Sequence, residues 1–279
     1  MSKHIAPQVV TIDGVSVRYA EGTAGPVDAL LLSPWPESVY AFEQVWPLLA
    51  EHAHLIAVDP PGFGQSDYRQ ELMNPKAMAG FIVRVADELE LSRPHVVAPD
   101  IGTSSTLFAA AGHPDRFASL VIGSGGAAVP LQVTGVLKDW IDATDLQPYR
   151  DMGGSAIVDI ALSTIAGYTP SEEIRDDYRT SYQGDRFADT IPYAQAYREQ
   201  LPQLADLLSA IKTPIRIVQG SDDQVVPAVN AEYLHARLPH SRVDFIDGAG
   251  HFCWEERPDA YATLIVDWWN TNPAAGPLA

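Results

Sequence analysis

The stretch that decides the fold is His95-Val96-Val97-Ala98-Pro99-Asp100-Ile101-Gly102-Thr103-Ser104. It combines an apolar run, a tight turn and the start of a helix. The segment matches the pattern small residue–x–nucleophile–x–Gly, in which a sharp turn lifts the central side chain above a sheet. Small flanking residues let the strand and the helix approach closely. Gly102 meets this need, Ala98 replaces the usual glycine, and Asp100 stands where most such turns carry serine.

Apolar runs and amphipathic stretches alternate on both sides of this turn. Asp13-Gly14 predicts a hairpin between its two flanking strands. Strands are predicted at Val9–Ile12, Val15–Tyr19, Ala29–Leu32, Leu55–Val58, His95–Ala98, Leu120–Ile122, Ile215–Val218 and Val243–Ile246. Helices are predicted at Ala41–Glu51, Pro75–Leu89, Ser104–Ala111, Ala228–Leu238 and Asp259–Trp269. This alternation predicts an α/β fold with a mostly parallel sheet that is covered on both faces.

The region from residue 131 to residue 208 interrupts the alternation. Its pattern is helical and polar-aromatic, without a convincing buried strand. We therefore predict a core domain made of residues 1–130 and 209–279, and a helical lid, or cap, made of residues 131–208. Such an insertion would cover the carboxyl ends of the strands, where open α/β sheets bind ligands. A structural subdomain without substrate contacts is the alternative.

Composition limits the function classes. The chain has 279 residues, 46% of them hydrophobic, and a formal net charge of −18. This charge would repel a phosphate backbone, so nucleic acid is not expected as a partner. The sequence has no run of 18 apolar residues and no secretory signal pattern, so neither a membrane span nor export is predicted. The single cysteine, Cys253, fits a reducing cytoplasm. A small-molecule substrate is expected, and a homodimer is compatible with the sequence.

Four further segments accompany the turn at Asp100. They are Ser33-Pro34-Trp35-Pro36-Glu37-Ser38, Asp59-Pro60-Pro61-Gly62-Phe63-Gly64-Gln65-Ser66, Gly220-Ser221-Asp222-Asp223-Gln224-Val225-Val226-Pro227 and Gly248-Ala249-Gly250-His251-Phe252-Cys253-Trp254-Glu255. In this order of nucleophile, acid and histidine, the chain resembles α/β-hydrolase-fold enzymes, and within them the epoxide hydrolase and haloalkane dehalogenase branch. The resemblance spans residues 9–269 and implies an α/β-hydrolase fold with a helical lid.

The resemblance assigns roles to the loop residues. The spacing Gly-x-x-Asp-x-x-x-Pro selects Asp223 as the acid, although the neighbouring Asp222 competes for the role. Asp223 would orient His251, and His251 would act as the general base. The backbone N–H groups of Trp35 and Ile101 would form the oxyanion hole.

An aspartate is already ionised at neutral pH, so Asp100 suits displacement at a saturated carbon and a covalent alkyl ester intermediate. An epoxide-opening enzyme also needs acids for the leaving oxygen, commonly two lid tyrosines. By resemblance these are Tyr149 and either Tyr193 or Tyr197. An epoxide hydrolase-like enzyme is therefore the leading interpretation.

Other functions stay open. Ile101, directly after the nucleophile, removes one halide donor that dehalogenases carry, and Ser33-Pro34 replaces the usual His-Gly. A haloalkane dehalogenase, a diverged ester, lactone or carbon–carbon bond hydrolase, and a non-catalytic ligand-binding protein are the alternatives. No metal is expected, because no ligand-spaced cluster occurs, and no nicotinamide or flavin is expected, because no Gly-x-Gly-x-x-Gly turn follows the first strand.

Overall fold

The computed structural model describes residues 4–272, and its centre is an eight-stranded sheet. The strands run in the spatial order β1-β2-β4-β3-β5-β6-β7-β8. Their bounds are β1 Pro7–Ile12, β2 Val15–Glu21, β3 Asp28–Leu32, β4 His54–Val58, β5 His95–Pro99, β6 Leu120–Gly123, β7 Ile215–Gly220 and β8 Ser241–Ile246. Strands β1 and β2 are antiparallel and the other six are mutually parallel, which confirms the mostly parallel sheet.

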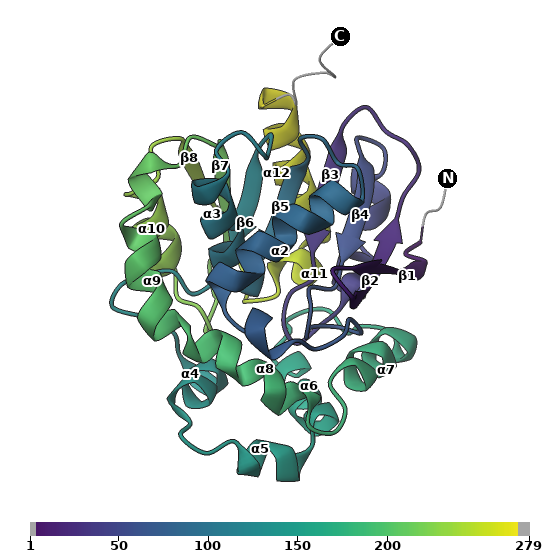
Figure 1. Ribbon diagram of the computed structural model, residues 1–279, viewed down its shortest axis with the longest axis vertical. Helices are drawn as coiled ribbons and strands as arrows, with labels where there is room; N and C mark the ends of the chain where they lie inside the picture. The colour runs from purple at the N-terminus through teal and green to yellow at the C-terminus, as the bar shows by residue number, and fades with distance from the viewer. Residues whose placement is uncertain (1–3, 273–279) are drawn as a thin grey trace.

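Helices cover both faces of this sheet. The core helices are α1 Trp46–Leu49, α2 Pro75–Glu88, α3 Ile101–Gly112, α10 Val229–His235, α11 Cys253–Glu256 and α12 Pro258–Thr271. Residues alternate between the two faces, so Leu30 and Leu32 pack with α2 and α3, whereas Leu31 packs with α1 and α12. Figure 1 shows α2 and α3 in front of the sheet and α12 behind it.

One helix that the sequence predicts as continuous is interrupted in the structure. The sequence pattern predicts a single helix over Ala41–Glu51, but the structure has a 3₁₀ turn at Val39–Phe42 and then the short helix α1. Pro47 explains the break, because it has no N–H for a continuing helix and is tolerated in a first turn. Further 3₁₀ turns lie at Gln70–Leu72 and Leu208–Ala210.

Six helices lie between β6 and β7. They are α4 Gly135–Asp142, α5 Gln147–Met152, α6 Gly154–Leu162, α7 Glu172–Ser181, α8 Arg186–Gln195 and α9 Tyr197–Ala205. Figure 1 shows α4 to α8 gathered at one end of the sheet. We call these six helices the cap helices; their status as a separate domain stays a prediction. Among residues 4–272, no helix is long and apolar enough to cross a membrane.

Candidate active site

The turn at Asp100 joins the end of β5 to the start of α3. Asp100 has a φ of 53° and a ψ of −121°, a conformation that a residue with a side chain rarely adopts. Its backbone N–H donates to the carbonyl of Gly123 at 2.9 Å, which holds the turn against the end of β6. At Gly102 a Cβ atom would come within 2.9 Å of the Ala98 Cβ, so only glycine fits there without a shift.

The Asp100 carboxylate is held in one orientation. The backbone N–H of Trp35 donates to its Oδ2 at 2.8 Å, and the Ile101 N–H also favours the ionised form. Its other oxygen, Oδ1, lies 3.7 Å from Nε2 of His251. One oxygen therefore occupies the predicted oxyanion hole, and the second faces the imidazole.

Asp223 lies on the other side of the same imidazole. Its Oδ2 is 3.0 Å from Nδ1 of His251, and its Oδ1 accepts the backbone N–H groups of Val225 and Val226 at 2.8 Å each. Asp222, the competing acid, is exposed and contacts Ser221. The structure thus brings Asp100, His251 and Asp223 together and leaves Asp222 outside.

Burial sets the charges of this group. It raises the pKa of Asp100, and the nearby His251 and the N–H groups of Trp35 and Ile101 oppose that rise. Burial alone would lower the pKa of His251, but the carboxylates of Asp223 and Asp100 outweigh it, so the pKa of His251 is raised. The two neighbouring carboxyl groups thus favour the protonated form of the His251 imidazole.

A narrow, mostly apolar cavity opens beside Asp100 and His251. Its walls come from the loop after β3, from cap helices α4 and α6, and from the two loops that carry the acid and the histidine. The lining residues are Trp35, Pro36, Asp100, Val136, Leu137, Trp140, Ala161, Thr164, Val225, His251 and Phe252. The indole Nε1 of Trp35 is buried and has no hydrogen-bond partner. The cavity thus offers apolar surface and few polar groups.

The three tyrosines that the sequence suggested as acids do not line this cavity. Tyr193, on α8, donates its hydroxyl to the carbonyl of Ile101 in the first turn of α3 at 2.9 Å. Tyr197 is buried beside it, with ring centroids 6.0 Å apart. Tyr149 lies on α5 at the outer edge of the cap helices and reaches only the carbonyl of Asp139 (Figure 1). The role of these tyrosines as acids therefore stays a prediction.

Sequence reasoning missed two groups of site residues. Gln219, the residue before the acid loop, donates its side-chain amide to Asp223 Oδ2 at 2.8 Å and so shares that oxygen with His251. The cavity walls from α4 and α6 were also missed, since an apolar residue of an amphipathic helix gives no sign of whether it faces a cavity or a core. For Gln219, a buried polar residue at the end of an apolar strand was the available signal.

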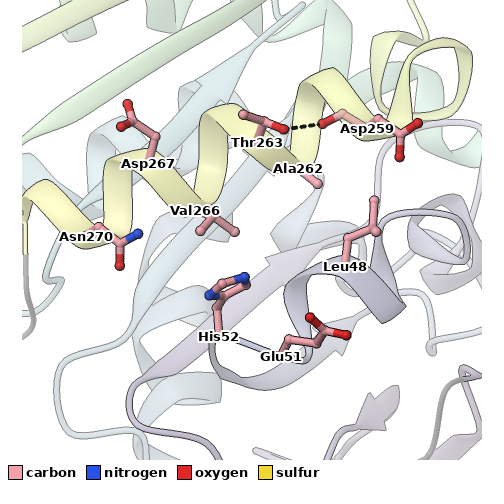
Figure 2. A pocket seen from close by; sticks show the side chains of 9 residues that line it. All are labelled: Leu48, Glu51, His52, Asp259, Ala262, Thr263, Val266, Asp267 and Asn270. Carbon is pink, nitrogen blue, oxygen red and sulfur yellow. Dashed lines mark hydrogen bonds between the residues drawn. The ribbon is translucent and has the colours of Figure 1, made fainter.

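A wider surface hollow lies elsewhere and has none of these features. Figure 2 shows it between α1 and α12, with His52 and Glu51 on one side and Asp259, Val266 and Asn270 on the other. None of the residues around His251 lines it. Among residues 4–272, no three His, Cys, Asp or Glu side chains are grouped to hold a metal ion.

Comparisons with known proteins agree with this architecture. Residues 30–258 match the family described as alpha/beta hydrolase fold. A 2-hydroxy-6-oxononadienedioate/2-hydroxy-6-oxononatrienedioate hydrolase from Cupriavidus pinatubonensis is 24% identical over 80% of this chain and 78% of its own length.

Two solved structures have the same fold over nearly their whole length. The epoxide hydrolase CorEH is 19% identical with a TM-score of 0.77, over 96% of this chain and 99% of its own. A loop variant of the haloalkane dehalogenase DbeA from Bradyrhizobium elkanii is 21% identical with a TM-score of 0.79, over 98% of this chain and 99% of its own.

Proposed function

Because the chain belongs to the alpha/beta hydrolase fold family, we propose that it is a hydrolase whose nucleophile is Asp100 and whose intermediate is a covalent alkyl ester of that side chain. The observation that carries the proposal is the hydrogen bond from the Trp35 N–H to Asp100 Oδ2. A serine-type hydrolase keeps these donors for the carbonyl oxygen of its substrate. Here the carboxylate itself occupies them, which suits an enzyme whose own side chain becomes the acyl group.

The first step is displacement at a saturated carbon. Asp100 Oδ1 attacks the carbon, a carbon–oxygen bond forms, and the bond to the leaving group breaks with its electron pair on that group. Oδ2 becomes the carbonyl oxygen of the ester and keeps its contact with the Trp35 N–H. The carboxylate gives up its negative charge in this step.

The second step follows from that loss of charge. The Asp100 carboxylate helps to raise the pKa of His251 in the resting protein. Once Asp100 is esterified, this contribution disappears, so the pKa of His251 falls and more of the imidazole is in the neutral form that can accept a proton from water. It then directs water onto the Asp100 carbonyl carbon. The oxyanion forms at Oδ2, which the Trp35 N–H already contacts, and the alcohol leaves.

The cavity walls favour a small, uncharged, apolar substrate. Within the described residues, none of the side chains that line the cavity is a lysine or arginine, and two of its groups are Asp100 and His251. An anionic substrate, such as the dicarboxylate named for the Cupriavidus relative, would find no lysine or arginine to pair with. The walls from Leu137, Trp140 and Phe252 offer burial of an alkyl or aryl group instead.

The leaving group is either a halide or an epoxide oxygen. An epoxide oxygen needs a proton, and the tyrosines expected to supply it lie outside the cavity. A halide leaves as a stable anion and needs only a donor, and Trp35 carries a buried indole N–H without a partner. The wall chemistry therefore favours a carbon–halogen bond. The segment Trp35-Pro36-Glu37-Ser38, which resembles that of epoxide hydrolases, supports the epoxide as the second candidate.

Mass spectrometry of a His251→Gln variant tests both the mechanism and the leaving group. The variant is incubated separately with a 1-bromoalkane and with the terminal epoxide of the same chain length. We expect an adduct on Asp100, because glutamine cannot act as the base in the second step. The bromide leaves an alkyl group and the epoxide leaves a hydroxyalkyl group, so the two adducts differ in mass by one oxygen atom.

Two control variants complete this experiment. In the His251→Gln background, Asp222→Asn should keep the adduct, because Asp222 is exposed and away from the imidazole, and Asp100→Asn should remove it. An adduct on another residue contradicts the covalent mechanism. The mechanism is also contradicted if the wild-type enzyme turns over one of the substrates but the variant forms no adduct with it.

A further inference from the structure

Glu256 is a buried glutamate that does not line the cavity beside Asp100. It is the last residue of α11, it follows His251 closely in the chain, and it is 5% exposed. Its Oε2 accepts the backbone N–H of Gly250 at 2.6 Å, whereas its Oε1 is buried without a hydrogen-bond partner among the described residues. Because a buried carboxylate with a single donor costs free energy, we expect its bond to serve the neighbouring histidine.

The bond to Glu256 holds one end of a peptide group whose other end is also held. This peptide group joins Ala249 to Gly250, in the loop of residues 247–252 between β8 and α11. The Ala249 carbonyl accepts the backbone N–H of Asp222 at 2.8 Å, and the Gly250 N–H donates to the Glu256 carboxylate. The peptide group therefore bridges α11 and the loop after β7, which carries the acid of the site.

Close packing fixes Gly250 from two sides. At Gly220, the last residue of β7, a Cβ atom would come within 2.0 Å of the Gly250 carbonyl oxygen, so this carbonyl lies directly against the end of the strand. At Gly250 a Cβ atom would come within 2.9 Å of Glu256 Oε1. The φ angle of Gly250 is not in the left-handed region, so glycine is needed there for space rather than for its conformation.

We propose that Glu256 is a positioning residue, which fixes the peptide group before His251 and thereby holds the imidazole between Asp223 and Asp100. The 3.0 Å contact of His251 Nδ1 with Asp223 and the 3.7 Å approach of Nε2 to Asp100 both require one placement of the ring. Loss of the anchor frees the peptide group to rotate, and the ring then moves away from its carboxylates. The catalytic consequence rests on the proposed function, whereas the placement of the ring in the resting protein does not.

The charge of Glu256 supports the same state of the imidazole. Burial lowers the pKa of His251, but the carboxylates of Asp223, Asp100 and Glu256 outweigh that effect. These groups reach the ring from the loop after β7, from the turn after β5 and from α11. Glu256→Gln keeps an oxygen that can accept from Gly250 and removes the charge, so this variant separates the hydrogen bond from the charge.

Nuclear magnetic resonance of the resting full-length protein tests the placement without any substrate. A hydrogen bond to a carboxylate moves the signal of the His251 Nδ1 proton far downfield. We expect this signal in the wild type and in Glu256→Gln, and its loss from Glu256→Leu, which has no acceptor. Gly250→Ala should also lose it, because the added methyl group displaces the carboxylate. Glu255→Leu is the matched control: Glu255 is buried in the same helix but accepts from Tyr178, so the signal should stay.

The outcomes of this experiment are distinct. A signal that persists in both Glu256→Leu and Gly250→Ala overturns the positioning role. A signal that is lost from Glu255→Leu as well also overturns it, because the effect then belongs to the packing of α11 as a whole. If Glu256→Leu does not fold, Gly250→Ala decides alone, since it keeps the glutamate and changes only the space that the carboxylate occupies.

Steady-state kinetics with the substrate identified by adduct formation tests the catalytic consequence. Glu256→Leu should lower kcat by at least about tenfold, as misplaced catalytic groups do, and should change KM by less than about twofold, because Glu256 does not line the cavity. Glu256→Gln should stay within about threefold of the wild-type kcat. Adding Gly250→Ala to Glu256→Leu should cost little more, since both changes break one bond.

Two kinetic results contradict the role. They are a loss that appears mainly in KM, and a double variant whose loss in kcat equals the product of the two single losses. If Asp100 forms no adduct with any substrate, the proposed function fails while the resonance result still stands.

Discussion

The buried acids near His251 differ in the number of hydrogen bonds that they accept. The carboxylate of Asp223 accepts four donors: the N–H groups of Val225 and Val226, the amide of Gln219 and Nδ1 of His251. The pair Glu37 and Glu255 receives one donor for each carboxyl. Both sites exclude water to a similar degree. The difference teaches that acids of similar burial near the imidazole can differ widely in the number of donors that compensate for the lost water.

The contrast follows from local backbone structure. Asp223 lies at the start of a turn, where free backbone N–H groups at Val225 and Val226 point toward its side chain. Glu255 lies within the single turn of α11, and Glu37 follows Pro36 in a loop. Within residues 4–272, no backbone N–H group donates to either side chain. Glu255 therefore accepts a hydrogen bond from Tyr178, and Glu37 accepts one from Trp254.

The largest effect should come from removing the charge at the donor-rich site. In Asp223→Asn the amide presents N–H groups to donors, and the charge that stabilises the His251 imidazolium is lost. We expect kcat to fall by about 10⁴-fold, as when other histidine-orienting aspartates are replaced. Steady-state kinetics with the substrate found by adduct formation measures it.

Asp222→Asn is the matched control for that variant. Asp222 is exposed and is next to Asp223 in the sequence. The kcat of Asp222→Asn should therefore stay within about twofold of the wild-type value, as for most surface changes. If both variants lose activity alike, Asp223 is not the orienting acid, and its four donors have a structural purpose instead.

The sequence motifs predicted the loops that carry Asp100, Asp223 and His251 better than they predicted the residues that line the cavity. The turn at Asp100, the register that selects Asp223 and the loop of His251 are local patterns, because each depends on a few adjacent residues with fixed backbone needs. The strands were also predictable, since short apolar runs such as Leu30, Leu31 and Leu32 are typical of strands that are buried on both faces of a sheet.

Contacts between distant segments were not predictable. Tyr193 has the spacing, and Tyr197 the Tyr-Arg pattern, that resemble those of the family's catalytic tyrosines, but the Tyr193 hydroxyl donates to the backbone carbonyl of Ile101. The hydrogen bond from the Trp254 indole to Glu37 joins residues that are far apart in the chain and have no shared pattern. Donor counts for buried acids depend on such tertiary contacts, so the sequence alone does not give them.

A second, smaller effect should come from removing a donor that is itself charged. Arg18 is 5% exposed, and its Nε donates to the fully buried Asp59 at 2.6 Å. Its other end pairs with Asp177 of α7. Arg18→Met leaves Asp59 with backbone donors from Val39 and Gln65 only. We expect the free energy of unfolding to fall by about 3–5 kcal/mol, measured by urea denaturation.

A double variant separates charge from packing at this position. Adding Asp59→Asn to Arg18→Met removes the unpaired buried charge, so part of the lost stability should return. Asp177→Asn alone, at a partly exposed position, should cost only about 1 kcal/mol or less. No recovery in the double variant would mean that the alkyl stem of Arg18, rather than its charge, holds the loop after β4 in place.

The smallest effect should come from a donor whose acceptor carries no charge. Tyr193 donates to the carbonyl of Ile101, which is a neutral group, so Tyr193→Phe should lower the free energy of unfolding by only about 1 kcal/mol. Because the hydroxyl is bound to that carbonyl, the variant should also slow a bromoalkane and an epoxide of the same chain length by the same factor, below about tenfold. Single-turnover rates with both substrates measure this. A loss confined to the epoxide, of about 10²-fold or more, would identify Tyr193 as the acid that protonates the opening oxygen. That result would contradict the comparison, because a hydroxyl that is bound to a carbonyl in the resting protein would then move to the reacting atoms. The hydrogen bonds of the resting protein would in that case not predict which groups exchange protons.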